Sequence, residues 1–474
     1  MPKLNVKPAS DRLYNELLAT AFDGRGRNAR YRKSQLFFLH SHLRTDLEKI
    51  RAAIKQDRCS ADADVGVELA LSLNAIRRLY QDIDFNHSIQ EEFRITRNEN
   101  NAERRIPYGV VVLKPTLRTR FFSIISALAA AFAAGNVVLL ELEPSLHAVD
   151  QYFRTEFEIF DGASCIIAST RIEDATFLSR CRVVDQTTNA TIYPDSLQHR
   201  PHQITIAVVD GTANVRKAAS EIIASKCRFG GSSPYGVDIV LANEWVKDEF
   251  LTQCKDILET EYSTLQQHSE RVQAVKTPKN SKSKGNVLLD LSGVQIKEYT
   301  RNAFELQGKP PTQAIHLLTV TGIVDAMTIA AEQGPCLALY SFSSAGEAKY
   351  LSLFIDSDIC MLNQIPLPLL VGPPLPVTNH AVDLHLRYDT LEMSKPAPQR
   401  IRSFASDKNP GQFCGHAVRP FKPVKQSSGF DIGFFDRGAL VGGVVIVLPT
   451  LCALIFGGYQ IVATGVRNFL RPLS

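Results

Sequence analysis

Apolar residues recur every three or four positions over residues 10–100, with polar residues between them. The stretches SQLFFLHSHLRTDLEKIRAAI and VELALSLNAIRRLYQDI show this spacing, which places the apolar side chains on one face of a helix. The pattern therefore predicts that the chain opens with a helical region, which we assign to residues 1–105.

From Tyr108 the pattern changes to short β-branched runs separated by helical segments. The runs are GVVVLK, NVVLLEL, ASCIIAS, CRVVDQ, ITIAVVD and VDIVLA, with helices expected at 123–134 and 214–228. The first of these helices is expected to end at Gly135 and Asn136. Alternating strands and helices predict a doubly wound α/β sheet.

The stretch between Arg437 and Arg467 contains no charged residue. About 20 apolar residues are enough to cross a bilayer, and its glycine pairs and Pro449 are tolerated in membrane helices. We therefore expect a transmembrane helix at 438–466 and a short tail at 467–474. The alternative is a buried core helix, although such helices usually carry a polar face.

Because so few residues follow this helix, it would insert after translation as a tail anchor, leaving the main domain in the cytosol. Residues 397–437 form a basic linker without periodicity, which either touches anionic head groups or is simply solvated. The N-terminus has no apolar run of signal-peptide length.

A chain of 474 residues exceeds one hydrophobic core, so we expect two or more lobes. The formal charge of +4, from 53 basic and 49 acidic residues, is too small to indicate nucleic-acid binding. The nine cysteines form no CxxC pair, which argues against a zinc site or a disulfide framework and favours a reducing compartment.

Several segments, taken in order, resemble the aldehyde dehydrogenase superfamily, and especially its class 3 branch of membrane-anchored fatty aldehyde dehydrogenases. They are ELALSLNAIRRLYQDI, IPYGVVVLKP with AAAFAAGNVVLL, VVDGTANVRKAASEIIASKCRF, VDIVLANEWVKDEFL, FELQGKPP, GPCLALYSFSS and RYDTLEM. The resemblance covers residues 10–396 and implies an aldehyde-dehydrogenase-like α/β fold, with a modified Rossmann domain at 106–205 and a catalytic-type domain with an oligomerisation arm at 206–396. It also implies a homodimer and oxidation of aldehydes to acids with NAD or NADP.

The resemblance places the nucleophile loop after Phe229, where the family has a cysteine and this chain reads GGSSPYGVD. Cys227 is the nearest thiol and the candidate for a displaced nucleophile, although a small core residue is the alternative. Ser232 and Ser233 could attack a carbonyl only with an adjacent base.

The other catalytic positions also depart from the family. The general-base turn reads SLQHRPHQ and contains no carboxylate, so His199 or His202 would have to act as the base unless both are simply exposed. The oxyanion asparagine is replaced by Arg118 or Thr119 in KPTLRTRFF. An arginine carries a fixed cation where the family places a neutral amide.

The cofactor positions are altered in the same way. Glu141 or Glu143 stands where the family has a lysine that reaches the adenosine ribose. A carboxylate can bind ribose hydroxyls but repels a 2′-phosphate, which favours NAD over NADP. The pyrophosphate glycine is missing from VVDQTTN, where Asp185 adds negative charge, whereas Glu305 in FELQGK matches the family motif.

These substitutions predict a tail-anchored, catalytically silent pseudoenzyme that acts as a scaffold or as a partner of active enzymes. The first alternative is an active NAD-dependent oxidation of a lipophilic aldehyde at a membrane surface. The second is a membrane-organising protein that binds no ligand.

Overall fold

The computed structural model describes residues 9–58, 61–143, 145–156, 164–187, 197–198, 203–262, 285–301, 313–373, 386–395, 397–398 and 434–469. The chain divides into two compact units, Met1–Ile401 and Arg402–Ser474. The buried hydrophobic clusters of the described residues extend from Leu17 to Leu391, so they belong to the first unit.

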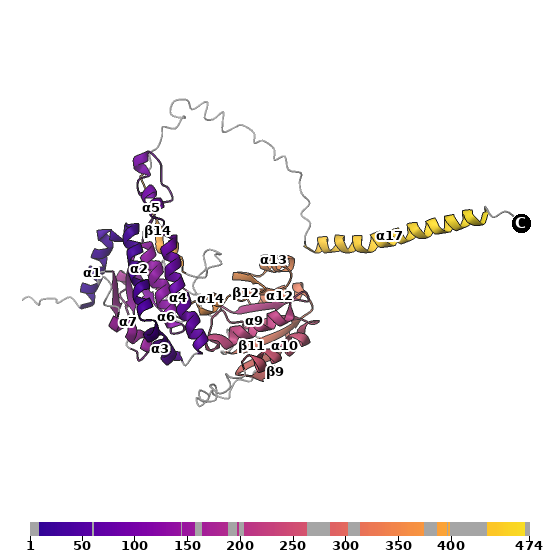
Figure 1. The fold of residues 1–474 in the computed structure, drawn as a ribbon, viewed down its shortest axis with the longest axis horizontal. Coiled ribbons are helices and arrows are strands. Elements are labelled where there is room, and N and C mark those ends of the chain that lie inside the picture. The colour runs from indigo at the N-terminus through magenta and orange to yellow at the C-terminus, as the bar shows by residue number, and fades with distance from the viewer. Residues whose placement is uncertain are drawn as a thin grey trace, which may run out of the picture. The chain divides into compact units, whose positions relative to one another are not determined.

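The first unit contains two lobes, of which the first begins with helices (Figure 1). The apolar faces of the helices at 29–45, 47–58 and 62–82 pack into one cluster with the helix at 120–134, as their spacing requires, whereas Leu17 of the first helix belongs to a separate cluster. The bounds are α1 Ala9–Asp23, α2 Ala29–Thr45, α3 Leu47–Arg58, α4 Asp62–Asp82 and α5 Phe85–Glu92.

A parallel five-stranded sheet forms the centre of the first lobe, in the order β4-β3-β2-β5-β6. The strands are β2 Val110–Lys114, β3 Val137–Glu141, β4 Cys165–Ala168, β5 Arg182–Asp185 and β6 Leu197–Gln198. Helix α6, Arg120–Ala134, links β2 to β3 and is buried along nearly its whole length. It ends at Gly135, whose φ of 88° suits glycine. Helices α7 Ala148–Glu156 and α8 Ala175–Leu178 complete the lobe.

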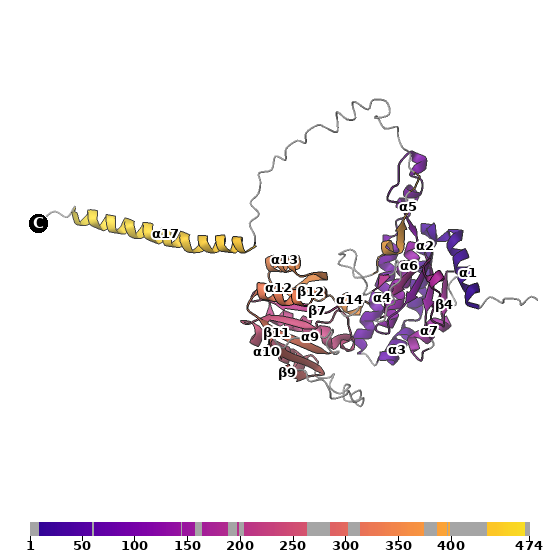
Figure 2. The same cartoon turned by 180° about the vertical axis from the view of Figure 1, so that it is seen from behind.

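The second lobe is built on a seven-stranded sheet in the order β13-β12-β7-β8-β11-β10-β9 (Figure 2). Only β9 is antiparallel to its neighbour among these described strands. The strands are β7 Thr205–Val209, β8 Ile239–Asn243, β9 Asn286–Leu291, β10 Val294–Tyr299, β11 Ala314–Val320, β12 Cys336–Phe342 and β13 Ser357–Leu362. The helices are α9 Val215–Cys227, α10 Lys247–Thr260, α12 Ile323–Glu332, α13 Ala345–Phe354 and α14 Leu367–Val371.

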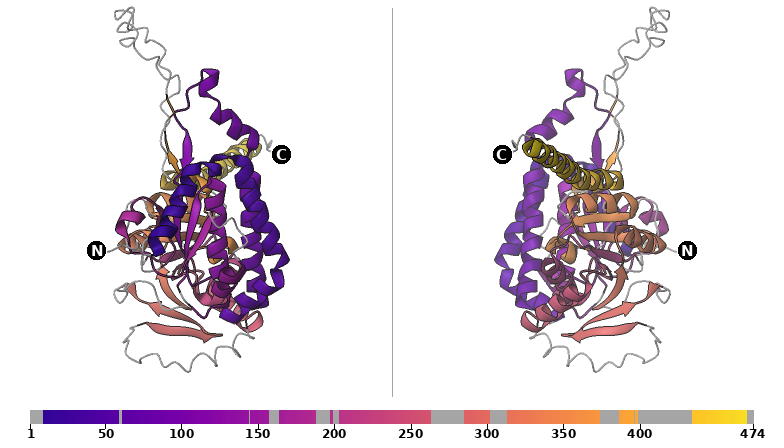
Figure 3. Two further views of the ribbon diagram at one scale, coloured as in Figure 1. Left: turned by 90° about the vertical axis from the view of Figure 1, so that its left-hand side faces the viewer. Right: turned by 90° about the vertical axis from the view of Figure 1, so that its right-hand side faces the viewer.

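An arm extends from the first lobe beside α5 (Figure 3). It consists of β1 Arg105–Pro107, which pairs antiparallel with β14 Glu392–Ser394 from the distant end of the first unit. A two-stranded sheet of this size has little stability of its own.

The second unit contains one described helix, α17 Phe434–Phe469. Its segment Gly438–Thr464 has 27 residues and a mean hydropathy of 2.6, and none of that window is buried, so it is long and apolar enough to cross a membrane. Pro449 lies inside the helix and has no N–H to donate. The adjacent Thr450 hydroxyl donates to the carbonyls of Ile446 and Val447 at 2.7 and 2.9 Å. The sequence-based expectation of an α/β fold with an apolar C-terminal helix is confirmed.

Candidate functional site

Cys227 is the last residue of α9, where its small apolar side chain packs into the core of the second lobe. Burial raises the pKa of its thiol to about 12, and the carboxylate of Asp64 raises it further. A thiol needs a nearby cation or a helix N-terminus to ionise at neutral pH, and Cys227 lies at a helix C-terminus instead. This environment does not favour a nucleophile.

The loop after α9 turns sharply at three consecutive residues with left-handed backbone. Phe229, Gly230 and Gly231 have φ values of 52°, 66° and 67°. At Gly231 an added Cβ would lie 2.5 Å from the carbonyl oxygen of Lys226, so only glycine fits. The N–H of Phe229 donates to Asp64 Oδ2 at 2.9 Å, which fixes the turn against α4.

The two loop serines are held by backbone carbonyls. The Ser232 hydroxyl donates to the carbonyl of Phe229 at 3.0 Å, and Arg58 Nη2 donates to that same carbonyl at 3.0 Å. The Ser233 hydroxyl donates to the carbonyl of Leu370 at 2.9 Å. Among the described residues, the hydrogen bonds of the two hydroxyls involve no histidine or carboxylate that could accept a proton.

Arg118 connects the start of α6 with the end of α14. Its Nη1 donates to the carbonyl of Leu370 at 2.7 Å, and its Nη2 donates to Val371 and Gly372 at 3.0 and 2.5 Å. The Thr119 hydroxyl donates to Val371 as well, at 2.7 Å. These bonds satisfy carbonyls at a helix C-terminus, where a cation is favourable.

Burial lowers the pKa of Arg118 to about 9, with a further contribution from the nearby Arg58 cation. From the sequence, either Arg118 or Thr119 could replace the oxyanion amide. In the structure both side chains donate to the Val371 carbonyl at the end of α14. Their donors therefore point at fixed protein carbonyls rather than at open space.

Beside this connection lies a small cavity of about 30 Å³, enough for about two water molecules. Its polar lining comes from Asp57, Arg58, Glu68, Arg120 and His147. Glu68 Oε1 accepts the N–H of Phe122 at the start of α6, 3.2 Å away, and burial raises the pKa of this carboxyl. A cavity of this size does not hold an aldehyde substrate with a cofactor ring.

Glu141 and Lys114 form a buried ion pair at the carboxyl ends of β3 and β2. Glu141 Oε2 lies 3.6 Å from Lys114 Nζ and accepts the N–H of Ile172 at 3.3 Å. Burial raises the pKa of the Glu141 carboxyl, and Lys114 opposes that shift. Glu143 is exposed, so Glu141 is the residue at the edge where doubly wound sheets bind ligands.

A dinucleotide fits this edge poorly. The Glu141 side chain is 8% exposed and the Lys114 side chain 6%, so neither presents its charged atoms to a ribose. Asp185 Oδ1 accepts the N–H and the hydroxyl of Thr187 at 2.9 and 2.6 Å, so the end of β5 carries a carboxylate, whereas a phosphate binds to N–H donors. Glu305, His199 and His202 lie outside the described residues.

A separate group of His42, Asp46 and Glu156 has the residue types of a metal site. Lys49 Nζ lies 3.3 Å from a carboxylate oxygen of each acid, so an ammonium already neutralises them. Sequence reasoning missed this group, because its members come from two helices more than 100 residues apart.

No protein-family model and no curated protein matches the sequence. Solved structures do match. The chain is similar to a substrate-bound AldH of Staphylococcus aureus, with 16% identity, 87% of this chain and all of that chain covered, and a TM-score of 0.66. An acetylating aldehyde dehydrogenase of Geobacillus thermoglucosidasius shows 12% identity, 83% and 97% coverage and a TM-score of 0.61.

An NAD-dependent benzaldehyde dehydrogenase of Corynebacterium glutamicum is also similar, with 14% identity, 75% and 84% coverage and a TM-score of 0.55. Identities this low establish the fold rather than the activity. The chain has the fold of the aldehyde dehydrogenases.

Proposed function

We propose that this protein is a membrane-tethered, catalytically silent member of the aldehyde dehydrogenase fold, which acts as a scaffold or as a partner of active enzymes. The observation that carries the proposal is the arrangement at the end of α9. A buried thiol precedes a loop that lacks cysteine, and Arg118 donates to three backbone carbonyls, one of which, that of Leu370, also accepts from Ser233 of this loop.

The chemistry of thiohemiacetal formation supports this proposal. Aldehyde oxidation by this fold family needs a thiolate and a donor aimed at the developing oxyanion. Because burial raises the pKa of the Cys227 thiol to about 12, this thiol is protonated at pH 7. The Arg118 guanidinium is the cation nearest in sequence to the oxyanion position, and its hydrogen bonds within the described part of the chain go to protein carbonyls.

The aldehyde assay tests the silent site. Full-length protein in detergent micelles is mixed with NAD or NADP and with short and long aldehydes, and NADH or NADPH absorbance is followed. We expect no rate above the enzyme-free blank. A steady rate that disappears in Cys227→Ala would establish the alternative, an active oxidation by a displaced nucleophile.

Cofactor binding separates a ligand-binding pseudoenzyme from a protein without a ligand. A ligand that binds only the folded state raises the thermal midpoint with its concentration. Because Glu141 is engaged by Lys114, we expect millimolar NAD to leave the midpoint unchanged. A saturable rise would instead assign NAD binding to the protein.

The membrane part of the proposal is supported by α17, whose 27-residue segment Gly438–Thr464 is long and apolar enough to cross a membrane. We propose a single-pass C-terminal anchor with the main domain facing the cytosol. Fractionation of a tagged chain with and without residues 437–474 tests the anchor, and protease protection of an N-terminal tag tests the orientation. Release of the shortened chain into the soluble fraction is the expected result.

We also propose a homodimer. Support comes from the arm, because the short β1 and β14 pair only with each other among the described strands and need a further surface for stability. Light scattering of the detergent-solubilised chain, with the detergent mass subtracted, is expected to give twice the mass of one chain. Ile106→Asp, in the middle of β1, is expected to shift it to the monomer.

A further inference from the structure

The start of the chain contains a segment with charge of one sign. Residues 24–45 read GRGRNARYRKSQLFFLHSHLRT, with six arginines and lysines and no aspartate or glutamate. Such segregation contrasts with the balanced composition of the whole chain, in which 53 basic and 49 acidic residues interleave. A local positive surface is the consequence.

Most of this segment lies in helix α2, and the spacing of its residues determines which side of the helix each one occupies. Its buried side includes Leu36, Leu39 and Leu43, which pack in the core of the first lobe. Residues 30, 33, 37 and 44 are separated by three, four and seven positions, so they share one side of the helix, next to the buried side. That face therefore presents three cations with Phe37 between them.

The aromatic residues of this face are unusually open. Phe37 is 58% exposed and the adjacent Phe38 is 59% exposed, and their rings contact each other edge to face with centroids 6.0 Å apart. Two neighbouring phenylalanines left in water lose the free energy that burial of apolar area would provide. Their exposure calls for an apolar partner.

Helix α4 adds one cation and one aromatic ring to the same surface. Lys33 Nζ lies 4.8 Å from the centroid of the Tyr80 ring. Burial lowers the pKa of His40, and the cations of Arg77 and Arg44 lower it further, which places both arginines around this histidine. We call Arg30, Lys33, Phe37 and Arg44 of α2, with Arg77 and Tyr80 of α4, the α2 patch.

The cations of the α2 patch have no carboxylate partner within the described part of the chain. The ion pairs that the structure describes do not include Arg30, Lys33, Arg44 or Arg77. Like charges that face one another without an acid favour binding of an external anion. The patch thus combines cations that attract anions with exposed apolar rings that favour contact with an apolar surface.

We infer that the α2 patch binds an anionic lipid surface, with its cations on the head groups and Phe37 at the boundary of the acyl chains. This inference rests on the proposed membrane tether, which would hold the patch at a high effective concentration near a bilayer. Basic residues near an anionic leaflet contribute additively to binding, and an aromatic ring beside them adds apolar burial. The phosphates of a nucleic acid would pair with the cations, but the rings of Phe37 and Phe38 would remain exposed to water.

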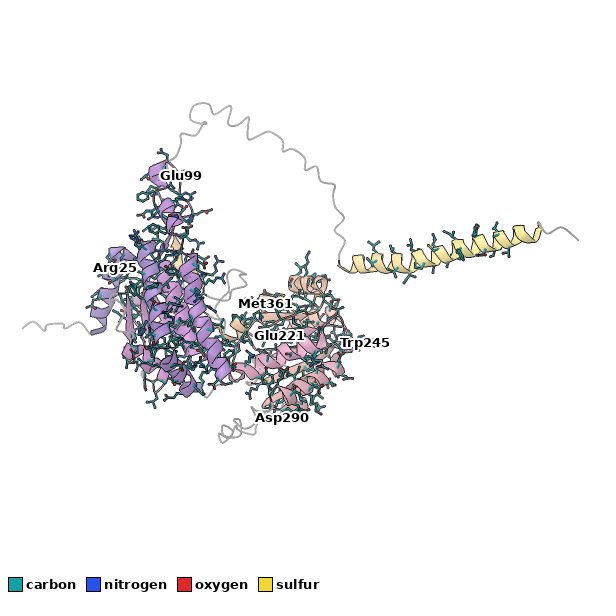
Figure 4. All side chains as sticks on the ribbon, in the orientation of Figure 1. Arg25, Glu99, Glu221, Trp245, Asp290 and Met361 are labelled. Carbon is teal, nitrogen blue, oxygen red and sulfur yellow. The ribbon has the colours of Figure 1, made fainter. Side chains whose placement is uncertain are left out.

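A single-tryptophan reporter tests the inference in the full chain. The protein has one tryptophan, Trp245, which is 83% exposed at the outer edge of the second lobe (Figure 4). Phe37→Trp combined with Trp245→Phe moves the only indole into the α2 patch, and the unchanged chain is the matched control. Both are reconstituted into phosphatidylcholine vesicles with or without about 30% phosphatidylserine, in which a fraction of the lipids carry brominated acyl chains.

We expect the indole at position 37 to be quenched and blue-shifted in the anionic vesicles. Its emission should return toward the aqueous value in neutral vesicles or at 0.5 M NaCl, where the Debye length is about five times shorter than at 0.02 M. Trp245 should remain aqueous throughout. Quenching that is equal in neutral and anionic vesicles, or absent from both, would overturn the inference.

Charge reversal of the patch is a second, independent test. Arg30→Glu with Lys33→Glu and Arg44→Glu should weaken the anionic-lipid association at least about tenfold. The control Arg216→Glu with Lys217→Glu and Lys349→Glu reverses three exposed cations of the second lobe and should change it less than twofold. Equal losses in both variants would contradict a local patch. If the reversed variant fails to fold, the salt dependence of the reporter still decides.

The outcomes separate this inference from the tether itself. A chain that fails to float with neutral vesicles refutes the C-terminal anchor. A chain that floats while position 37 stays aqueous on anionic vesicles refutes the α2 patch alone. A polynucleotide that displaces the vesicles at a lower concentration than they bind would assign the patch to nucleic acid instead.

Discussion

Two buried lysine–carboxylate pairs occupy opposite ends of the sheets in the two lobes. Lys114 and Glu141 lie 3.6 Å apart at the carboxyl ends of their strands. Lys226 and Asp238 lie 3.1 Å apart at the start of the second sheet, where Asp238 Oδ2 also accepts the N–H of Thr205 at 3.0 Å. Ligands of α/β sheets often bind at the carboxyl ends of the strands, which is the edge where the first pair lies, whereas the second pair joins α9 to the starts of β7 and β8.

The two pairs therefore differ in what they contribute to the fold. The second pair keeps strands β7 and β8 aligned, and its loss would affect folding. The first pair neutralises a place where the fold usually meets a cofactor, and its loss would affect stability less.

Breaking the framework pair is expected to have the largest effect. Lys226→Met leaves the Asp238 carboxylate buried without its ammonium, which typically costs about 3–5 kcal/mol in the free energy of unfolding. Urea unfolding of the full chain in detergent measures the loss. Lys217→Met, on the exposed side of the same helix, is the control and should cost less than about 0.5 kcal/mol. Similar losses in both variants would contradict the framework role.

Arg118 sharpens the comparison, because carbonyls rather than a carboxylate hold this buried cation. Arg118→Ala removes three charge-assisted hydrogen bonds and leaves the end of α14 without its donors. We expect a loss of about 2–4 kcal/mol by urea unfolding. Arg118→Lys should recover only part of it, since an ammonium cannot reproduce the fork. If Arg118→Ala left the free energy of unfolding unchanged, the hydrogen bonds of Arg118 would not contribute to stability.

In the arm, burial raises the pKa of the Glu392 carboxyl more than the nearby Arg32 cation lowers it. Burial raises its pKa to about 7, although Arg32 Nη1 lies 4.0 Å away. Between about pH 4.5 and pH 7 the folded chain then binds more protons than the unfolded chain, so stability falls as the pH rises. Glu392→Gln should remove on the order of 2 kcal/mol of this pH dependence. An unchanged pH profile would show that Glu392 does not titrate in this range.

Breaking the ligand-edge pair should have the smallest effect. In Lys114→Met, Glu141 can take up a proton and lose its charge, so we expect a loss of only about 1–2 kcal/mol at pH 6. The loss should grow toward pH 8, because the folded state then has to give up that proton. If Lys114→Met lowered the free energy of unfolding as much as Lys226→Met does, and independently of pH, the two pairs would not differ in their contribution to stability.

Much of the framework could be predicted from local patterns. The helix before Gly135 ends where the sequence placed its end, and the expected helix at 214–228 is α9, Val215–Cys227. These features depend on neighbouring residues, such as a glycine that allows left-handed backbone and a run of β-branched residues. The α/β order of the chain followed from them.

The site could be predicted only in part. The sequence located Glu141, Arg118 and Cys227 as departures from a family pattern, but not what they touch. Lys114 is 27 residues from Glu141 in sequence, and the carbonyls that hold Arg118 follow it by more than 250 residues. Such contacts depend on how strands are ordered and lobes are packed, which periodicity does not encode.

The central claim is that Cys227 is an inert core thiol, and its alkylation rate tests this most directly. Folded full-length protein is treated with iodoacetamide at pH 7, with and without NAD, and the modification of each cysteine is followed by mass spectrometry. The account predicts that Cys227 reacts at least about 100-fold more slowly than the exposed Cys360 and that NAD changes nothing. Cys227 reacting as fast as Cys360, or faster when NAD is present, would contradict it.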